Sequence, residues 1–146
     1  MKDKYLRAFM SMVEIFSETS ESKRLKVAAC LIKNGNPICF GTNGTPPGWP
    51  SNVCEDEDGN TLPEVLHAEV QCLNKLRKIS ETSIGATLLI THSPCIRCCR
   101  EIVDAGIRQV FYKHEYRDLT GVQYLKDNGV TVEQLGETDE QIVEER

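Results

Sequence analysis

The sequence lacks any apolar run long enough to cross a bilayer, and Met1 to Met10 carries no secretory leader. It also lacks internal repeats and low-complexity tracts. Its seven cysteines are an odd number, which argues against a framework of paired disulfides. We therefore expect a reduced, cytoplasmic protein with no membrane segment.

Positive charge is also scarce. The chain has 17 Lys and Arg against 22 Asp and Glu, a formal charge of −5, and a pI near 5.2. Non-specific binding of nucleic acid depends on clustered Lys and Arg, and single strands also need stacking surfaces, for which the chain offers one tryptophan, Trp49. These shortages argue against a nucleic-acid track and against an editor of polynucleotides, whereas a small anionic substrate needs only a local basic patch.

The length and the apolar patterning are those of one α/β domain. A single domain of residues 1–146 would bury roughly two thirds of the surface that the unfolded chain exposes. Apolar residues at helical spacing predict helices at Lys2–Glu18, Pro63–Lys78, Cys95–Ala105 and Gly121–Asn128. β-branched and apolar runs predict strands at Leu25–Lys33, Pro37–Thr42, Ala86–His92, Arg108–Tyr112 and Val130–Leu135.

The order of these elements predicts a mixed sheet of five strands flanked by helices, with parallel, right-handed crossovers. Asn34, Gly35 and Asn36 indicate a hairpin turn between the first two strands. The segment Gly41–Asp58 is predicted to be a long loop, and long loops in compact domains are often functional. Glu137–Arg146 is an acidic tail, which we expect to fray or to dock on a neighbour.

The most specific signal is His67-Ala68-Glu69, followed 25 residues after Glu69 by Pro94-Cys95-Ile96-Arg97-Cys98. One imidazole and two thiolates are three zinc ligands, which leave the fourth tetrahedral position for water. A structural site would close that position with another Cys or His. Zinc lowers the pKa of bound water from about 16 towards roughly 7, so the pattern favours a hydrolytic site.

Glu69 is the natural proton carrier of such a site. Two positions along a helix correspond to about 200° of rotation, so Glu69 is not expected to bind the same metal as His67. General acid and base work of this kind contributes about 10²- to 10⁴-fold to the rate. Ser93 and Pro94 are predicted to be the N-cap and first turn of the helix that carries the cysteines, whose thiol pKa values a helix N-terminus would lower.

The cysteines also allow other interpretations. A lone Cys-x-x-Cys in a reduced protein is more often a redox pair or half of a four-ligand zinc site, but the upstream His-x-Glu favours catalysis. Cys30, Cys39 and Cys72 lie in apolar stretches and are expected in the core. Cys99 is a spare metal ligand of low weight, and Cys54 is expected to be a structural thiol.

The H-x-E and P-C-x-x-C motifs are those of zinc nucleobase deaminases. Over about Leu25 to Leu135 the chain resembles the cytidine deaminase superfamily and, within it, the deoxycytidylate deaminase family. The loop from Gly41 to Gly48, Gly-Thr-Asn-Gly-Thr-Pro-Pro-Gly, is similar to that family's G-Y-N-G-x-P-x-G segment. The resemblance implies a three-layer α/β/α fold and the zinc-dependent hydrolysis of dCMP to dUMP and ammonia, a precursor step of thymidylate synthesis.

The resemblance also implies roles for individual residues. It assigns His67, Cys95 and Cys98 to one zinc ion and Glu69 to proton transfer. The substrate-binding residues that it implies are Thr42, Asn43, Ala68, Ser93, Pro94, Tyr116 and Asp118. Asn43 is implied to meet the sugar and the catalytic carboxylate, and a turn Asn beside Gly44 is the alternative. For the phosphate, Arg77, Lys78 and the backbone of residues 44–48 are candidates.

The resemblance also implies a homohexamer that is activated by dCTP and inhibited by dTTP, with Mg²⁺ accompanying these effectors. The chain departs from the family at Thr42, where the loop has Tyr, at Gln71, where Asn is usual, and in its short connection from Thr45 to His67, where larger relatives place an additional zinc. Alternatives are a deaminase of a modified cytidylate or of free (deoxy)cytidine. A non-catalytic zinc-binding module is a further alternative, which predicts a closed metal coordination.

Overall fold

The computed structural model describes residues 1–136, so the predicted acidic tail at Glu137–Arg146 lies outside the described residues. Four helices and five strands occur in this range, in the predicted order. The helices are α1 (Asp3–Ser17), α2 (Ala68–Leu76), α3 (Ile96–Asp104) and α4 (Thr120–Asp127), and the strands are β1 (Ala28–Lys33), β2 (Asn36–Thr42), β3 (Thr87–His92), β4 (Gln109–His114) and β5 (Thr131–Gln134).

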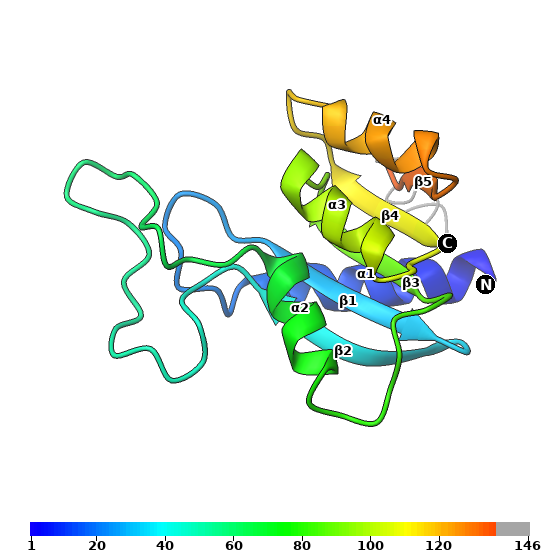
Figure 1. Ribbon diagram of the computed structural model, residues 1–146, viewed down its shortest axis with the longest axis horizontal. Coiled ribbons are helices and arrows are strands. Elements are labelled where there is room, and N and C mark those ends of the chain that lie inside the picture. Colours follow the sequence, from blue (N-terminus) through cyan, green and yellow to red (C-terminus); the bar gives the residue numbers. More distant parts are fainter. Residues whose placement is uncertain (137–146) are drawn as a thin grey trace, which may run out of the picture.

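The strands form one mixed sheet in the order β2-β1-β3-β4-β5 (Figure 1). β1 pairs antiparallel with both β2 and β3, whereas β3, β4 and β5 are parallel. The predicted hairpin joins β1 to β2, and both of its turn residues, Asn34 and Gly35, have the positive φ that tight hairpin turns require. The predicted α/β class and five-stranded mixed sheet are therefore confirmed.

Alternating side chains of β1 fill two separate cores. Ala28, Cys30 and Ile32 pack with α1 on one face of the sheet, and Ala29 and Leu31 pack with α2, α3 and α4 on the other. Leu31 is fully buried, which contributes about 2–3 kcal/mol of hydrophobic free energy. The helices thus cover both faces of the sheet in three layers, one helix behind and three in front (Figure 1).

Two of the helices begin later than the sequence pattern suggests. α2 was predicted to begin at Pro63, but Leu66 forms a β-bridge with Gly44, donating to its carbonyl at 2.8 Å and accepting its N–H at 3.1 Å, so the helix begins only at Ala68. α3 has Cys95 as its N-cap rather than Ser93. The Ser93 N–H donates to the His114 carbonyl at 2.9 Å and so extends the pairing of β3 with β4.

The segment between β2 and α2, residues 43–66, is the arm. It contains no helix and no regular strand, and it extends away from the sheet (Figure 1). It is longer than the predicted Gly41–Asp58 loop because the expected start of α2 belongs to it. Within residues 1–136 no helix combines the length and the apolar character that membrane crossing requires.

Close backbone approaches hold the starts of α2 and α3. A Cβ atom at Gly41 of β2 would lie 2.6 Å from both the Ala68 carbonyl oxygen and the Cys72 nitrogen. A Cβ atom at Gly121 of α4 would lie 2.5 Å from the Pro94 carbonyl oxygen. Both distances are shorter than van der Waals contact, so only glycine allows these elements to pack so closely.

We expect Gly41→Ala to lower the free energy of unfolding by about 1–3 kcal/mol, because the added methyl group must push α2 away from β2. The measurement is urea denaturation followed by circular dichroism. Gly44→Ala is the matched control, since a Cβ atom there meets nothing within 4 Å and its φ is not positive. Equal stability of the two variants would contradict the close contact.

Candidate active site

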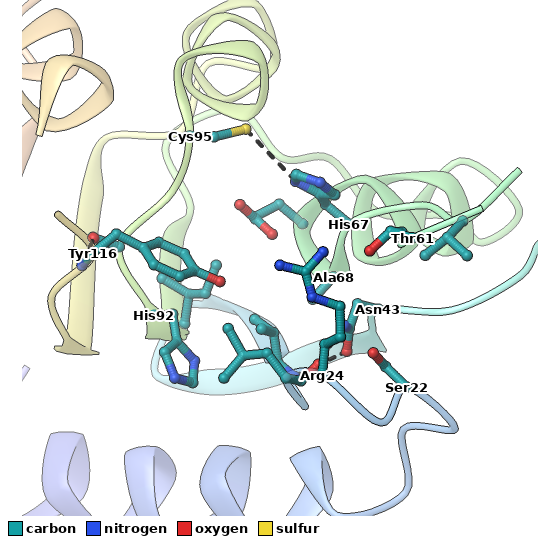
Figure 2. A pocket seen from close by; sticks show the side chains of 15 residues that line it. Ser22, Arg24, Asn43, Thr61, His67, Ala68, His92, Cys95 and Tyr116 are labelled. Carbon is teal, nitrogen blue, oxygen red and sulfur yellow. Dashed lines mark hydrogen bonds between the residues drawn. The ribbon is translucent and has the colours of Figure 1, made fainter. Parts of the chain in front are cut away.

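The sequence motif folds into a cluster of three donor atoms at two helix starts. His67 is the N-cap residue of α2, and Cys95 is the N-cap residue of α3, with Cys98 in the first turn of α3. The His67 Nδ1 atom lies 3.2 Å from Cys98 Sγ. It lies 3.6 Å from Cys95 Sγ, the contact that Figure 2 shows as a dashed line. All three donor atoms lie within 4.8 Å of one another, so they converge on one point.

This donor set fits zinc. Tetrahedral zinc with Zn–S of about 2.3 Å and Zn–N of about 2.0–2.1 Å places neighbouring ligand atoms about 3.6 Å apart, close to the distances seen here. Among residues 1–136 no fourth His, Cys, Asp or Glu joins the cluster, so the coordination that these side chains offer is open on one side. The non-catalytic module, which requires a closed coordination, is disfavoured.

Local electrostatics favour thiolate at this point. Hydrogen bonds from Cys98 and His67 lower the pKa of Cys95 to about 3, and the bond to Cys95 raises the pKa of His67. The pKa of Cys98 is raised because this thiol keeps the proton that the pair shares. Both cysteines also lie at the positive end of the α3 dipole, which stabilises anionic sulfur.

Glu69 is buried beside the ligands, with 4% of its surface exposed. Burial raises the pKa of its carboxyl group, and the opposing hydrogen bond from its own backbone N–H is the smaller effect. Glu69 is absent from the ligand cluster, as predicted, but the helical-rotation reason was wrong: His67 has extended backbone (φ −70°, ψ 157°) before the helix begins. A buried carboxyl group with a raised pKa holds a proton more readily than an exposed one, as a group that transfers protons to a substrate must.

A pocket of about 410 Å³ opens beside the cluster (Figure 2), within the range usual for small-molecule sites. It lies where β3 ends and β1 begins, between the starts of α2 and α3. Its lining residues are Ser22, Arg24, Leu25, Val27, Asn43, Thr61, Val65, His67, Ala68, Glu69, Ile90, His92, Ser93, Cys95 and Tyr116.

The structure brings four of the seven predicted substrate-binding residues to this pocket, namely Asn43, Ala68, Ser93 and Tyr116. The other three are outside its lining. Thr42 ends β2, Pro94 is fully buried, and Asp118 accepts hydrogen bonds from the Thr120 N–H and hydroxyl at the start of α4. Their roles in substrate binding stay predictions.

Asn43 is largely engaged by the protein itself. Its Oδ1 accepts hydrogen bonds from the Val27 N–H at 2.9 Å and the Ser20 hydroxyl at 2.8 Å, and its Nδ2 donates to the Leu25 carbonyl at 2.8 Å. One N–H of the amide is left for a ligand. Asn43 therefore braces the segment that precedes β1 while it lines the pocket.

Aromatic rings form one wall of the pocket. The Tyr116 ring lies 5.6 Å from the His92 ring, and its backbone N–H donates to the Ser93 hydroxyl at 2.8 Å (Figure 2). Burial and the neighbouring His114 lower the pKa of His92 to about 4, so this imidazole is neutral at physiological pH. His92 was missed from the sequence, although its alternation with Ile90 at the end of β3 places both on the same face.

The cation in the pocket was also missed. Arg24 reaches into the pocket from the segment before β1, with its guanidinium group towards Ala68 and His67 (Figure 2). Among residues 1–136 it has no ion-pair partner. The phosphate candidates Arg77 and Lys78 instead follow the last turn of α2, about 13 Å along the axis from its start, and do not line the pocket. No local pattern distinguishes Arg24 from other exposed basic residues.

Gln71 and the remaining cysteines have structural positions outside the ligand cluster. Gln71 donates from Nε2 to the carbonyl oxygens of Gly44 (3.2 Å) and Thr45 (3.0 Å), so it ties the start of the arm to α2. Cys30, Cys39 and Cys72 are buried, which confirms their expected place in the core. Cys54 is also buried, within the arm, and Cys99 is buried but outside the ligand cluster.

Comparison with known proteins is consistent with this geometry. The family model described as the cytidine and deoxycytidylate deaminase zinc-binding region matches residues 3–114. The ComE operon protein 2 of Bacillus subtilis is 34% identical over 141 residues, which cover 93% of this chain and 73% of that protein. The deoxycytidylate deaminase of Saccharomyces cerevisiae is 32% identical over 145 residues, covering 90% of this chain and 45% of that protein.

A solved structure gives the same result in three dimensions. The crystal structure of the dCMP deaminase from the cyanophage S-TIM5, in complex with dCMP and dUMP, superposes with a TM-score of 0.89. It is 46% identical in sequence, and the match covers 92% of this chain and 99% of that one. The three-layer fold implied by the resemblance is confirmed.

We expect the purified protein to bind one zinc ion per chain and Cys95→Ser to lose most of it, because a hydroxyl is a poor replacement for a thiolate ligand. Metal content by inductively coupled plasma mass spectrometry is the measurement. Cys99→Ser, a neighbouring thiol outside the cluster, is the control and should keep its zinc. Loss of zinc from both variants would argue that the metal depends on the fold of α3 rather than on Cys95 itself.

Proposed function

The chain belongs to the cytidine and deoxycytidylate deaminase family with a zinc-binding region, and we propose that it hydrolyses dCMP to dUMP and ammonia. The observation that carries the proposal is a buried carboxyl group, Glu69, beside an open His67, Cys95 and Cys98 donor set at the end of a nucleotide-sized pocket. The dCMP deaminase with bound dCMP and dUMP, 46% identical over nearly the whole chain, supports the same reaction.

His67, Cys95 and Cys98 would hold the zinc ion. When bound, zinc supplies a Lewis acid that lowers the pKa of water at its open position and so provides the nucleophile at neutral pH. The protein contributes a fixed trigonal arrangement of donors, because two of them are N-cap residues whose backbones are set by packing.

Glu69 would carry the protons of the reaction. The net change adds water at C4 of the cytosine ring, breaks the bond from C4 to the exocyclic nitrogen, and leaves a C4 carbonyl and ammonia. N3 must gain a proton as water adds, and the leaving nitrogen must gain one before it departs. A single buried carboxyl group with a raised pKa can take the first proton from water and deliver it to N3, and then take the second from the hydroxyl group at C4 and deliver it to the leaving nitrogen, so that both protons of the water are accounted for.

The pocket walls suit a pyrimidine nucleotide. Val27, Val65 and Ile90 provide apolar surface, and Tyr116 and the neutral His92 provide flat rings for the base. The free N–H of Asn43 is available to donate to a sugar hydroxyl oxygen. The base would lie with C4 towards Glu69, and the sugar towards Asn43.

Arg24 is the group that we assign to the phosphate. A guanidinium offers paired N–H donors that match phosphate oxygens, and such charged hydrogen bonds are stronger than neutral ones. Its place in the pocket and its lack of an ion-pair partner among residues 1–136 leave it available to an anionic ligand. This favours a nucleotide over free (deoxy)cytidine.

The remaining features stay predictions from the resemblance. They are activation by dCTP, inhibition by dTTP, Mg²⁺ with these effectors, the homohexamer, the cytoplasmic location and the choice between dCMP and a modified cytidylate. Assaying ammonia release from dCMP, 5-hydroxymethyl-dCMP and deoxycytidine, with and without dCTP and dTTP, would test the choice of substrate and the response to the two effectors.

We expect Glu69→Gln to lower kcat for dCMP by about 10²- to 10⁴-fold, because the amide cannot transfer protons. Zinc content should stay near one ion per chain, since Glu69 is not in the ligand cluster. The measurements are ammonia release and metal analysis on the same preparation. A Glu69→Gln variant that keeps both zinc and full turnover would exclude the proposed mechanism.

We expect Arg24→Met to raise KM for dCMP by about 10- to 100-fold, the equivalent of losing charged hydrogen bonds worth about 1.5–3 kcal/mol. The kinetics of deoxycytidine, which has no phosphate, should stay unchanged. Arg77→Met removes the same charge at the far end of α2 and is the control. Equal losses with both substrates would show that Arg24 does not contact the phosphate.

A further inference from the structure

One carboxylate outside the pocket is bound to the backbone that carries Arg24. Glu55, in the arm, accepts three hydrogen bonds at a single oxygen, Oε2: from the Ser22 hydroxyl at 2.8 Å, the Lys23 N–H at 3.0 Å and the Arg24 N–H at 3.2 Å. These bonds hold the pKa of Glu55 below its ordinary value, with the Ser22 bond the largest cause. The carboxylate is therefore ionised at neutral pH.

The segment that Glu55 binds has no regular structure of its own. Residues 18–27 connect α1 to β1 without helix or strand, so their conformation depends on side chains from elsewhere. Asn43 binds the Leu25 carbonyl and the Val27 N–H on one side of Arg24. Glu55 binds the residues on the other side, so the two ends of the connection around Arg24 are fixed independently.

Glu55 is itself held in place. It forms a β-bridge with Thr61, and next to it the Leu62 N–H donates to the carbonyl of buried Cys54 at 2.8 Å. Glu55 does not line the pocket, so its negative charge is not presented to a substrate there. Glu55 thus positions the Arg24 backbone without lining the pocket itself.

We propose that Glu55 is a positioning residue for nucleotide recognition, which sets the place of the Arg24 guanidinium through the backbone of residues 22–24. The inference rests on the proposed function, because it assigns Arg24 to the phosphate. It predicts that loss of the Glu55 carboxylate weakens binding of the phosphorylated substrate and leaves the chemistry at Glu69 intact.

The test is steady-state kinetics of the full-length, zinc-loaded protein with dCMP and with deoxycytidine. For deoxycytidine, kcat/KM is measured, or its inhibition constant against dCMP where turnover is too slow. We expect Glu55→Ala to raise KM for dCMP by about 3- to 10-fold, the range for lost hydrogen bonds of about 0.5–1.5 kcal/mol, with kcat unchanged within about twofold. Deoxycytidine should behave as with the wild type.

Three further variants sharpen the test. Glu57→Ala removes the same charge from an exposed position in the arm and should leave KM unchanged. Glu55→Gln keeps an oxygen acceptor, so it should recover part of the KM, and it replaces Glu55→Ala if that variant does not fold. Arg24→Met combined with Glu55→Ala should be no worse than Arg24→Met alone, since both act on one contact.

The outcomes separate the two proposals. Wild-type turnover of dCMP decides the proposed function by itself, and its absence would remove both. If the wild type turns over dCMP, the Glu55 proposal is overturned by an unchanged KM in Glu55→Ala, by equal losses with dCMP and deoxycytidine, or by multiplicative losses in the double variant. An equal rise in KM for dCMP in Glu57→Ala would show that the effect comes from the loss of negative charge and not from the hydrogen bonds of Glu55.

Discussion

The site depends on one constraint, which is that the N-termini of α2 and α3 meet near the carboxyl end of β3. Three donor atoms must come within a few ångströms of one point, and none of them can be placed by local structure alone. His67 and Cys95 both belong to N-cap residues, where the backbone changes from extended to helical and the side chain is directed beyond the helix end. The two dipoles then favour anionic sulfur at the same point.

The sheet supplies the geometry for that meeting. β3 and β4 run parallel, and both lead to segments at the same edge, where Ser93 is joined to His114 before α3 begins. Gly41 and Gly121 allow β2 and α4 to press against the helix starts from opposite sides. The positions of the ligands are therefore a product of close packing across four elements, not of the motif itself.

Much of this was readable from the sequence because its signals are local. The Asn34-Gly35 turn, the apolar periodicity and the His-x-Glu and Cys-x-x-Cys spacings each depend on neighbouring residues, and they predicted the sheet and the three donor side chains that the structure brings together. The predicted start of α2 was wrong because Leu66 pairs with Gly44, which lies 22 positions earlier in the chain. Helical periodicity depends on neighbouring residues and cannot indicate such a long-range pairing.

The recognition residues were harder to predict for the same reason. Arg24 is one exposed cation among 17 basic residues, and only the folded chain brings it to the pocket while Arg77 lies at the wrong end of α2. Asn43 was expected to meet the sugar and the catalytic carboxylate, yet most of its hydrogen-bonding capacity is used to bind the segment before β1. Roles that depend on long-range contacts have no signature in composition or spacing.

The arm differs from the helix starts in how it is held. Close backbone contacts at Gly41 and Gly121 hold the helix starts that carry the candidate zinc ligands, whereas the arm is fastened to the Arg24 segment by a few side-chain oxygens. Exchanges around Glu55, away from the Gly44–Leu66 bridge and the pocket lining, therefore act on the Arg24 segment and not on Glu69. Such an arrangement lets a lineage retune which nucleotide it accepts while inheriting its reaction unchanged.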